Sequence, residues 1–319
     1  MSRRSQPKKP EPKLFAGQFP QLNHEFYSSN PAEYFRRRLY LLTVYAGSSD
    51  EFIKLLSKGI SYEKIYLKVD LANSTDSDKQ QYQNFLTTEA EVLLHHTAEA
   101  LLRLYFAHAD EPLCPWLECA RLRTPGDFKD RLVKFVASYS TVESRAAVAK
   151  VFLGKTPNED DELRNSAVVE IDRLLRVLGR RLREDDNLYN SAKHGLTVIA
   201  GESSFTLGSD GGQAFVGAQG QSISFLEKCG EDGEPKLWHK TTRWLSPRQA
   251  MWLTTLAINQ MASLWAIATN RYIGTDLDRI DVVTHEAVEA AITGEFAANQ
   301  AVTRWSVKLA YHPLDEVAE

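Results

Sequence analysis

The sequence predicts a mainly α-helical α+β protein, in which a helical bundle domain is followed by a small antiparallel β-meander packed with long helices. Helix-capping residues and apolar residues at helical spacing recur through the first two thirds of the chain. After Gly195 the pattern changes to alternating apolar and polar residues between clusters of glycine, serine and aspartate. With 43% hydrophobic and 25% charged positions among 319 residues, the chain can bury one large core or two moderate ones.

These patterns divide the chain into three parts. Residues 1–20 begin with MSRRSQPKKPEPK, which is basic and rich in proline and is not followed by an apolar segment. We therefore expect a disordered tail there rather than a secretory signal. Residues 21–195 form the predicted helical domain, and residues 196–319 form the predicted C-terminal unit of meander and helices.

The first helices are marked by their end residues. Asn30 and Glu33 supply an N-cap and a reciprocal capping acid on either side of a first-turn proline, and the helix is expected to end at Gly47. A shorter helix is predicted over residues 50–58 and a third over residues 61–69.

The longest predicted helix ends near His108, before a break that contains Asp110 and Pro112. Its buried stripe consists of apolar residues at helical offsets: Leu94, Ala98, Leu101, Leu102 and Tyr105. Two more helices are expected to follow, one that starts at Thr124 and one over residues 142–153.

Two helices complete the predicted helical domain. Residues 157–183 are acidic in the first turn and basic in the last turn, which complements the helix dipole at both ends. A shorter helix, DNLYNSAKHG, then begins at Asp186. Gly195 stands where a residue in the left-handed conformation commonly ends a helix.

The C-terminal unit is predicted from a change of period. About five strands are expected, with the sequences LTVI, SFTL, AFV, SISFLE and LWHKTTRW. Ser246 caps a long uncharged helix, and a further helix is expected over residues 284–296. From Arg304 to Tyr311 apolar and polar residues alternate, which predicts a late strand at the edge of the meander.

Charge and cysteine content limit the environment and the partners. A net charge of -4, with 38 basic against 42 acidic residues, argues against a protein that coats nucleic acid or an anionic membrane over its whole surface. No charge occurs between Arg248 and Arg271, but polar residues scattered through this stretch favour a helix inside a soluble core, so we predict no membrane span. Three cysteines without paired metal spacing indicate free thiols in a reducing compartment, and we expect a cytoplasmic protein.

The sequence contains no glycine-rich phosphate loop, no dinucleotide-binding fingerprint and no Gly-x-Ser-x-Gly elbow. On the long helix, Glu91, His95 and Glu99 are spaced by four residues, and Arg103 follows four further on. A functional interpretation makes His95, His96 and Glu99 metal ligands or proton shuttles. They are also ordinary helix stabilisers, and because the buried stripe lies elsewhere we expect them on flanking or solvated faces.

A second group of polar residues lies in the short helix: Asn187, Asn190, Lys193 and His194. Asn190 and His194 are four residues apart and therefore share a face. An imidazole that exchanges protons near neutral pH, a fixed amide and an ammonium make a workable phosphodiester site. The same residue types also suit a helix C-terminus, so helix capping is the alternative interpretation.

A long helix, a polar break and a helix that ends in NSAKHG resemble the HEPN superfamily of RNA-acting helical domains. Active members place an arginine, commonly followed by an asparagine, four to six residues before a histidine. The resemblance covers roughly residues 85–200, and Asn190 and His194 match the motif. Residues 187–189, where the arginine should stand, hold no arginine, and the nearest one upstream is Arg183.

The resemblance implies a metal-independent endoribonuclease that needs no cofactor. His194 would handle the proton of a ribose 2′-hydroxyl or of the leaving oxygen, while Asn190 orients the phosphate. Lys193, Asn187 and Arg183 are the expected phosphate contacts. The resemblance also implies a symmetric homodimer and a role as a toxin or antiviral effector.

The alternative is a non-catalytic helical scaffold that keeps the HEPN-like shape and binds a protein or nucleic-acid partner. The missing arginine favours this interpretation, because a lysine replaces the bidentate guanidinium only as a point charge. Six tryptophans and twelve tyrosines, several of them in the β-rich insert, offer a contact surface for a partner protein. A third option is a metal enzyme built from the histidines and carboxylates of the bundle, which predicts a bound transition metal.

Overall fold

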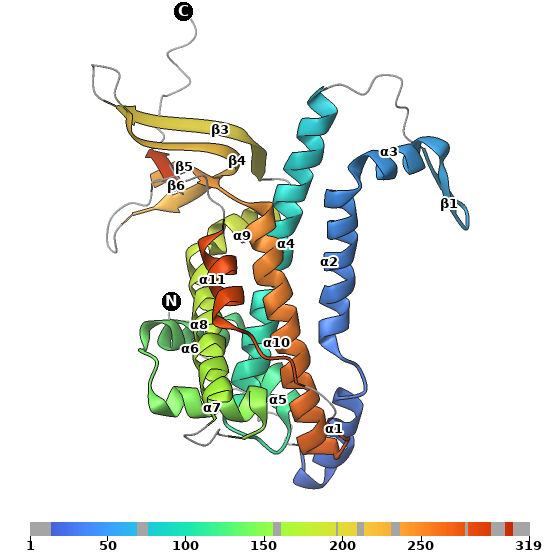
Figure 1. The fold of residues 1–319 in the computed structure, drawn as a ribbon, viewed down its shortest axis with the longest axis vertical. Helices are drawn as coiled ribbons and strands as arrows, with labels where there is room; N and C mark the ends of the chain where they lie inside the picture. Colours follow the sequence, from blue (N-terminus) through green and yellow to red (C-terminus); the bar gives the residue numbers. More distant parts are fainter. Residues whose placement is uncertain are drawn as a thin grey trace, which may run out of the picture.

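The computed structural model describes the following residues of the chain: 14–68, 76–155, 161–195, 197–208, 214–230, 237–277, 280–294 and 304–308. Long helices packed side by side form the body, and a four-stranded sheet lies at one end of it (Figure 1). A small hairpin projects beside α3 at the edge of the molecule (Figure 1). The predicted mainly helical α+β class is thereby confirmed.

Four helical segments begin the described chain: η1 (Ala16–Gln18), α1 (Phe19–Phe26), α2 (Pro31–Gly47) and α3 (Ser49–Lys58). The Asn30 side chain accepts a hydrogen bond from the backbone N of Ala32 at 2.9 Å, and α2 ends at Gly47 as predicted. Of the tail expected over residues 1–20, the part up to residue 13 lies outside the described residues. Residues 16–20 are helical instead: η1 comes first, and α1 then begins at Phe19, where a proline in its first turn favours a helix start.

The helix predicted over residues 61–69 is wrong. Two short antiparallel strands occupy this segment, β1 (Ile60–Tyr62) and β2 (Ile65–Leu67). β-branched and aromatic residues dominate both strands and favour a pleated backbone. Between them Glu63 has a φ of 51°, in the left-handed region that tight hairpin turns use.

Six helices follow: α4 (Asp76–Ala109), α5 (Pro115–Arg121), α6 (Pro125–Ala137), α7 (Val142–Leu153), α8 (Glu162–Glu184) and α9 (Asp186–Ala192). The predicted apolar stripe of α4 is confirmed, because each of its residues is at most 4% exposed: Leu94, Ala98, Leu101, Leu102 and Tyr105. After α9 the chain turns at Gly195, whose φ of 64° is the left-handed conformation expected there.

Two further helices return to this core, α10 (Pro247–Ile273) and α11 (His285–Thr293). α10 packs along α4, and its apolar residues belong to the same buried core as those of the earlier helices. Several of its polar side chains bond within the protein: the Thr254 hydroxyl, for example, donates to the carbonyl of Ala250 at 2.7 Å. Among the described residues, no helix combines the length and apolar character that crossing a membrane requires. The domain division at residue 195 stays a prediction.

The sheet contains four antiparallel strands in the order β3 (Val198–Gly208), β4 (Ala214–Cys229), β5 (Leu237–Trp244) and β6 (Arg304–Lys308). β6 pairs with β5 at the edge, which confirms the predicted late strand. The five short strands expected before it are three long ones. Gly201 and Gly217 do not interrupt the strands, because each pairs in register with a residue of the neighbouring strand.

Candidate functional site

The short helix α9 carries the HEPN-like residues and lies between α4 and the sheet (Figure 1). Leu188 is fully buried and packs against Ile223 and Phe225 of β4. The amide nitrogen of Asn187, the residue directly before Leu188, donates to a carboxylate oxygen of Glu227 at 2.8 Å. One apolar and one polar contact therefore fix α9 to the sheet.

Glu227 is a buried carboxylate that also accepts hydrogen bonds from Thr241 and Arg304. Burial alone raises the pKa of Glu227, but the hydrogen bonds from Thr241, Arg304 and Asn187 outweigh it and hold the pKa below its ordinary value. The Asn187 amide, an expected phosphate contact, is thus engaged with an ionised carboxylate of the sheet.

The remaining motif residues lie on the exposed side of α9. The Asn190 amide nitrogen donates to Asp186 at 2.9 Å, and its oxygen accepts from the Lys193 ammonium at 2.8 Å. The same ammonium lies 5.4 Å from the centre of the Tyr189 ring. His194 is exposed, and within the described part of the chain its side chain makes no hydrogen bond or ion pair. Asn190 and Lys193 are therefore oriented together, next to an accessible imidazole.

Two residues from other helices join this surface. Arg38 of α2 places a guanidinium nitrogen 3.0 Å from Nδ1 of His96, which lies on α4. Since arginine can only donate, Nδ1 accepts, and the proton of a neutral His96 ring lies on Nε2. The His96 ring meets the Tyr189 ring edge to face, with centroids 5.4 Å apart.

The local charges favour a neutral His96. Partial burial lowers its pKa, and the nearby Arg38 and Lys193 lower it further, while Glu99 raises it. We refer to the following six residues as the motif surface: Arg38, His96, Tyr189, Asn190, Lys193 and His194.

Arg183, the nearest arginine upstream of the motif, is exposed near the end of α8. Among the described residues it makes no hydrogen bond or ion pair with any motif residue. The arginine that does reach this surface is Arg38, which lies 58 residues before His96 in the sequence. Residue spacing could not identify it, because the contact depends on how α2 packs against α4.

Glu91 and His95 were expected on flanking or solvated faces, and this expectation is wrong. Both residues are only 2% exposed. The reason is that α4 contacts α2, α8, α9, α10 and the sheet, so that most of its circumference is covered near its middle (Figure 1). An apolar stripe marks one buried face of such a helix but does not show that the other faces are exposed.

Glu91 and His95 belong to a buried cluster that also contains Arg181, Asp185 and Arg243. The Asp185 carboxylate lies 3.3 Å from a guanidinium nitrogen of Arg181 and 3.3 Å from one of Arg243. Both oxygens of Glu91 and Nε2 of His95 are buried without a hydrogen-bond partner in the described part of the structure. Two arginines thus share one carboxylate, Asp185, directly before α9.

Burial sets the protonation of both unbonded groups. It raises the pKa of Glu91, although the charge of Arg181 acts in the opposite direction. It lowers the pKa of His95 to about 4, although the charge of Asp185 opposes this shift. His95 is therefore a neutral ring at neutral pH, and it stacks on Tyr189 at a centroid distance of 5.1 Å. Through this stack the buried cluster contacts the motif surface.

Metal binding was the third option for the helical histidines and carboxylates. Within the described ranges, no three side chains of histidine, cysteine, aspartate or glutamate lie close enough together to hold a metal ion. Glu99 instead pairs with Arg103 one turn along α4, which is the ordinary stabilising contact of a helix surface.

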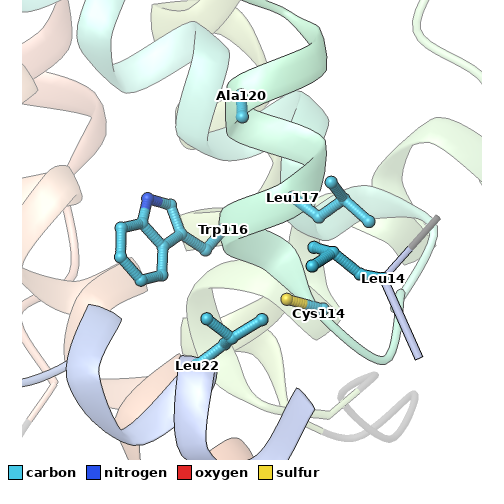
Figure 2. A pocket seen from close by; sticks show the side chains of 6 residues that line it. All are labelled: Leu14, Leu22, Cys114, Trp116, Leu117 and Ala120. Atoms are coloured by element: carbon cyan, nitrogen blue, oxygen red, sulfur yellow. The ribbon is translucent and has the colours of Figure 1, made fainter. Parts of the chain in front are cut away.

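Two apolar cavities lie on the helical body. A groove of about 300 Å³ between α2 and α4 begins at Arg38 and Glu89 and continues along apolar side chains that include Leu41, Tyr45 and Phe85. A second pocket of about 200 Å³ lies between α1 and α5 and is lined by the side chains that Figure 2 labels, none of which is charged. Only the first cavity adjoins the motif surface.

Comparison of the chain with protein-family models, curated proteins and solved structures finds no match. The resemblance to the HEPN superfamily therefore stays an expectation, which rests on the residues of α9 and its surroundings.

Glu91 offers a direct test of the buried cluster. In the unfolded chain this carboxyl ionises near its ordinary pKa of 4.5, whereas in the folded protein its pKa is raised. The wild-type protein therefore loses stability as the pH rises from the unfolded value towards the folded one, by ~1.4 kcal/mol for each unit of pKa difference. A neutral glutamine of the same size has no such loss.

We expect Glu91→Gln to match the wild type in stability at about pH 4 and to be more stable at about pH 8, as measured by denaturant unfolding at both pH values. Glu89→Gln, on the same helix but partly exposed, serves as the control and should show little pH-dependent difference. A difference between Glu91→Gln and wild type that is the same at both pH values would contradict a raised pKa.

Proposed function

We propose that this protein is a HEPN-like ribonuclease that cleaves RNA without a metal ion at the motif surface. The observation that carries the proposal is the position of Arg38. The α9 motif lacks the arginine that active HEPN domains have, and Arg38 supplies a guanidinium to the same surface from α2. A guanidinium can bind two phosphate oxygens at once, and a lysine cannot.

The cationic groups suit a phosphodiester. Arg38 contacts the His96 ring, His96 meets the Tyr189 ring, and the Lys193 ammonium lies over that same Tyr189 ring. Two cations placed in this way stabilise the negative charge that builds up on the phosphate oxygens in the transition state. Asn190 holds the Lys193 ammonium in place through its amide oxygen.

His194 is the proposed proton-transfer group. Its exposed imidazole would accept the proton of the ribose 2′-hydroxyl as the 2′-oxygen attacks the phosphorus. The bond to the 5′-oxygen breaks, and that oxygen takes a proton from solvent. The products are a 2′,3′-cyclic phosphate and a free 5′-hydroxyl.

The apolar groove beside Arg38 suits an unstacked base. Phe85 and Leu41 are among its exposed apolar residues, with exposed fractions of 48% and 73%. Proteins that recognise single-stranded RNA commonly stack splayed-out bases on aromatic side chains. We therefore propose single-stranded segments and loops as the substrate class.

The first experiment is incubation of the purified protein with a pool of structured and single-stranded RNAs in the presence of a chelator. We expect new 2′,3′-cyclic phosphate ends with the wild type and a loss of at least about 100-fold in rate with His194→Ala. His24→Ala, which removes an exposed histidine of α1, is the matched control and should cleave like the wild type.

Cleavage that survives His194→Ala would place the chemistry elsewhere. RNA binding without cleavage by the wild type would instead favour the non-catalytic scaffold. Two observations also support the scaffold: the motif arginine is missing, and the apolar groove between α2 and α4 is exposed. The proposal retains three expectations of the resemblance: a symmetric homodimer, a role as a toxin or antiviral effector, and a cytoplasmic location.

A further inference from the structure

A third cavity lies where the helical body meets the sheet, away from the groove at Arg38. Its volume is about 280 Å³, and its walls come from α8, β5, α10 and α11. The lining residues are Val177, Arg180, Arg181, Glu184, Arg243, Trp244, Gln249, Leu253 and Ile292. Three arginines therefore face one small cavity that also has an apolar wall.

The charges around this cavity do not balance. Asp185 neutralises one of the two buried arginines, Arg181 and Arg243, which both contact it at 3.3 Å. Glu91 lies behind them, and burial raises its pKa, which weakens it as a second counter-charge. Arg180 and Glu184 cancel each other at the exposed mouth. The residues that line the cavity, together with Asp185, thus comprise three arginines and two carboxylates, and an anion would offset the excess of positive charge.

Several polar atoms at the cavity have unused hydrogen-bonding capacity. Nε of Arg243 is buried without a partner among the described residues. Arg180 is exposed and makes no hydrogen bond or ion pair there. The contact of Arg181 with Gln249 is long, at 3.4 Å. A buried donor without an acceptor is unfavourable, so Nε of Arg243 favours a ligand that accepts hydrogen bonds, and Arg180 and Arg181 can donate to the same ligand.

We propose that this cavity binds a small organic phosphate, with the phosphate group held by Arg180, Arg181 and Arg243 and the organic group against Leu253 and Ile292. Arginine matches the geometry of phosphate oxygens, which it binds through paired N–H groups. The volume lies at the lower end of the range for small-molecule sites, which fits a compact phosphate ester better than a polymer.

Occupancy of this cavity would reach the motif surface through α9. Asp185, which Arg181 and Arg243 share, is the residue that immediately precedes α9. A phosphate that draws the two guanidinium groups towards itself changes the partners of that carboxylate. The cavity is thus placed to modulate the orientation of α9, and binding itself does not depend on the proposed RNA cleavage.

Calorimetry on the full chain at constant ionic strength tests the inference, with phenyl phosphate, inorganic phosphate and phenol as probes. We expect phenyl phosphate to bind more tightly than inorganic phosphate, and phenol not to bind. Arg180→Gln and Arg243→Gln should each weaken phenyl phosphate about tenfold or more. Arg164→Gln, which removes a surface arginine at the opposite end of α8, should bind like the wild type.

Arg180 is exposed, so Arg180→Gln is expected to fold normally and keeps the test valid if Arg243→Gln does not fold. Absence of phenyl phosphate binding by the wild type would overturn the inference, as would equal affinities of the wild type and Arg180→Gln. A short RNA oligonucleotide is the last probe. If only the oligonucleotide binds and Arg180→Gln weakens it, the cavity belongs to an RNA path and the small-molecule assignment is wrong.

Discussion

Replacing Asp185 with alanine is expected to lower the free energy of unfolding by about 3–5 kcal/mol, the typical effect of breaking a buried ion pair from one side. Asp185 is 3% exposed and is the shared partner of Arg181 and Arg243. Without it two mostly buried guanidinium groups lose their counter-charge. Denaturant unfolding followed by circular dichroism measures the effect.

The matched control is Asp110→Ala. Asp110 also pairs with an arginine, at 2.7 Å from Arg131, but Asp110 is 78% exposed and Arg131 is partly exposed. Solvent screens such a pair, so its loss should change the free energy of unfolding by less than about 1 kcal/mol. Equal effects of the two substitutions would show that burial of the Asp185 cluster contributes nothing.

Replacing Arg38 with alanine is expected to reduce the rate of RNA cleavage about 100-fold, comparable to the loss of one donor that stabilises a transition-state anion. Arg38→Lys keeps the charge but loses the paired N–H groups, so we expect an intermediate rate. Single-turnover cleavage of one defined RNA measures both variants against the wild type.

Arg37→Ala is the control for this prediction, because Arg37 is exposed and follows Arg36 on the same helix without joining the motif surface. Its cleavage rate should equal that of the wild type. If Arg38→Ala also cleaves at the wild-type rate, Arg38 does not replace the missing motif arginine, and the main support for the proposed ribonuclease is lost.

Local signals in the sequence predicted most helix ends. Asn30, Ser246 and Thr284 each accept a hydrogen bond from a backbone N–H in the first turn of the helix that follows them. Such caps depend only on neighbouring residues, so a sequence pattern can reveal them. The left-handed turn at Gly195, shortly after the end of α9, was predictable for the same reason.

Features that depend on long-range packing were not predictable in this way. The burial of Glu91 and His95 follows from the number of elements that surround α4, which no periodic pattern of one helix contains. The contact between Asn187 and Glu227 requires the position of α9 against the sheet. The hairpin at residues 60–67 is a different case, since β-branched and aromatic residues within the segment itself favour strands over the predicted helix.

The place of Arg38 shows the same limit for the candidate site. The motif around His194 could be read directly from the sequence, but the arginine that contacts His96 lies on a helix that precedes His194 by well over a hundred residues. A search for a motif within one short segment does not find such a contact. The three-dimensional arrangement of α2, α4 and α9 is needed to find it.

The strand β6 also links α9 to a distant part of the sequence. Arg304 of β6 contacts Glu227, and Glu227 in turn binds Asn187 of α9. Arg304 follows Glu227 by 77 residues, so a growing chain that has been synthesised only as far as β5 leaves Glu227 without this cationic partner. The attachment of α9 to the sheet is therefore complete only after β6 has joined the edge of β5.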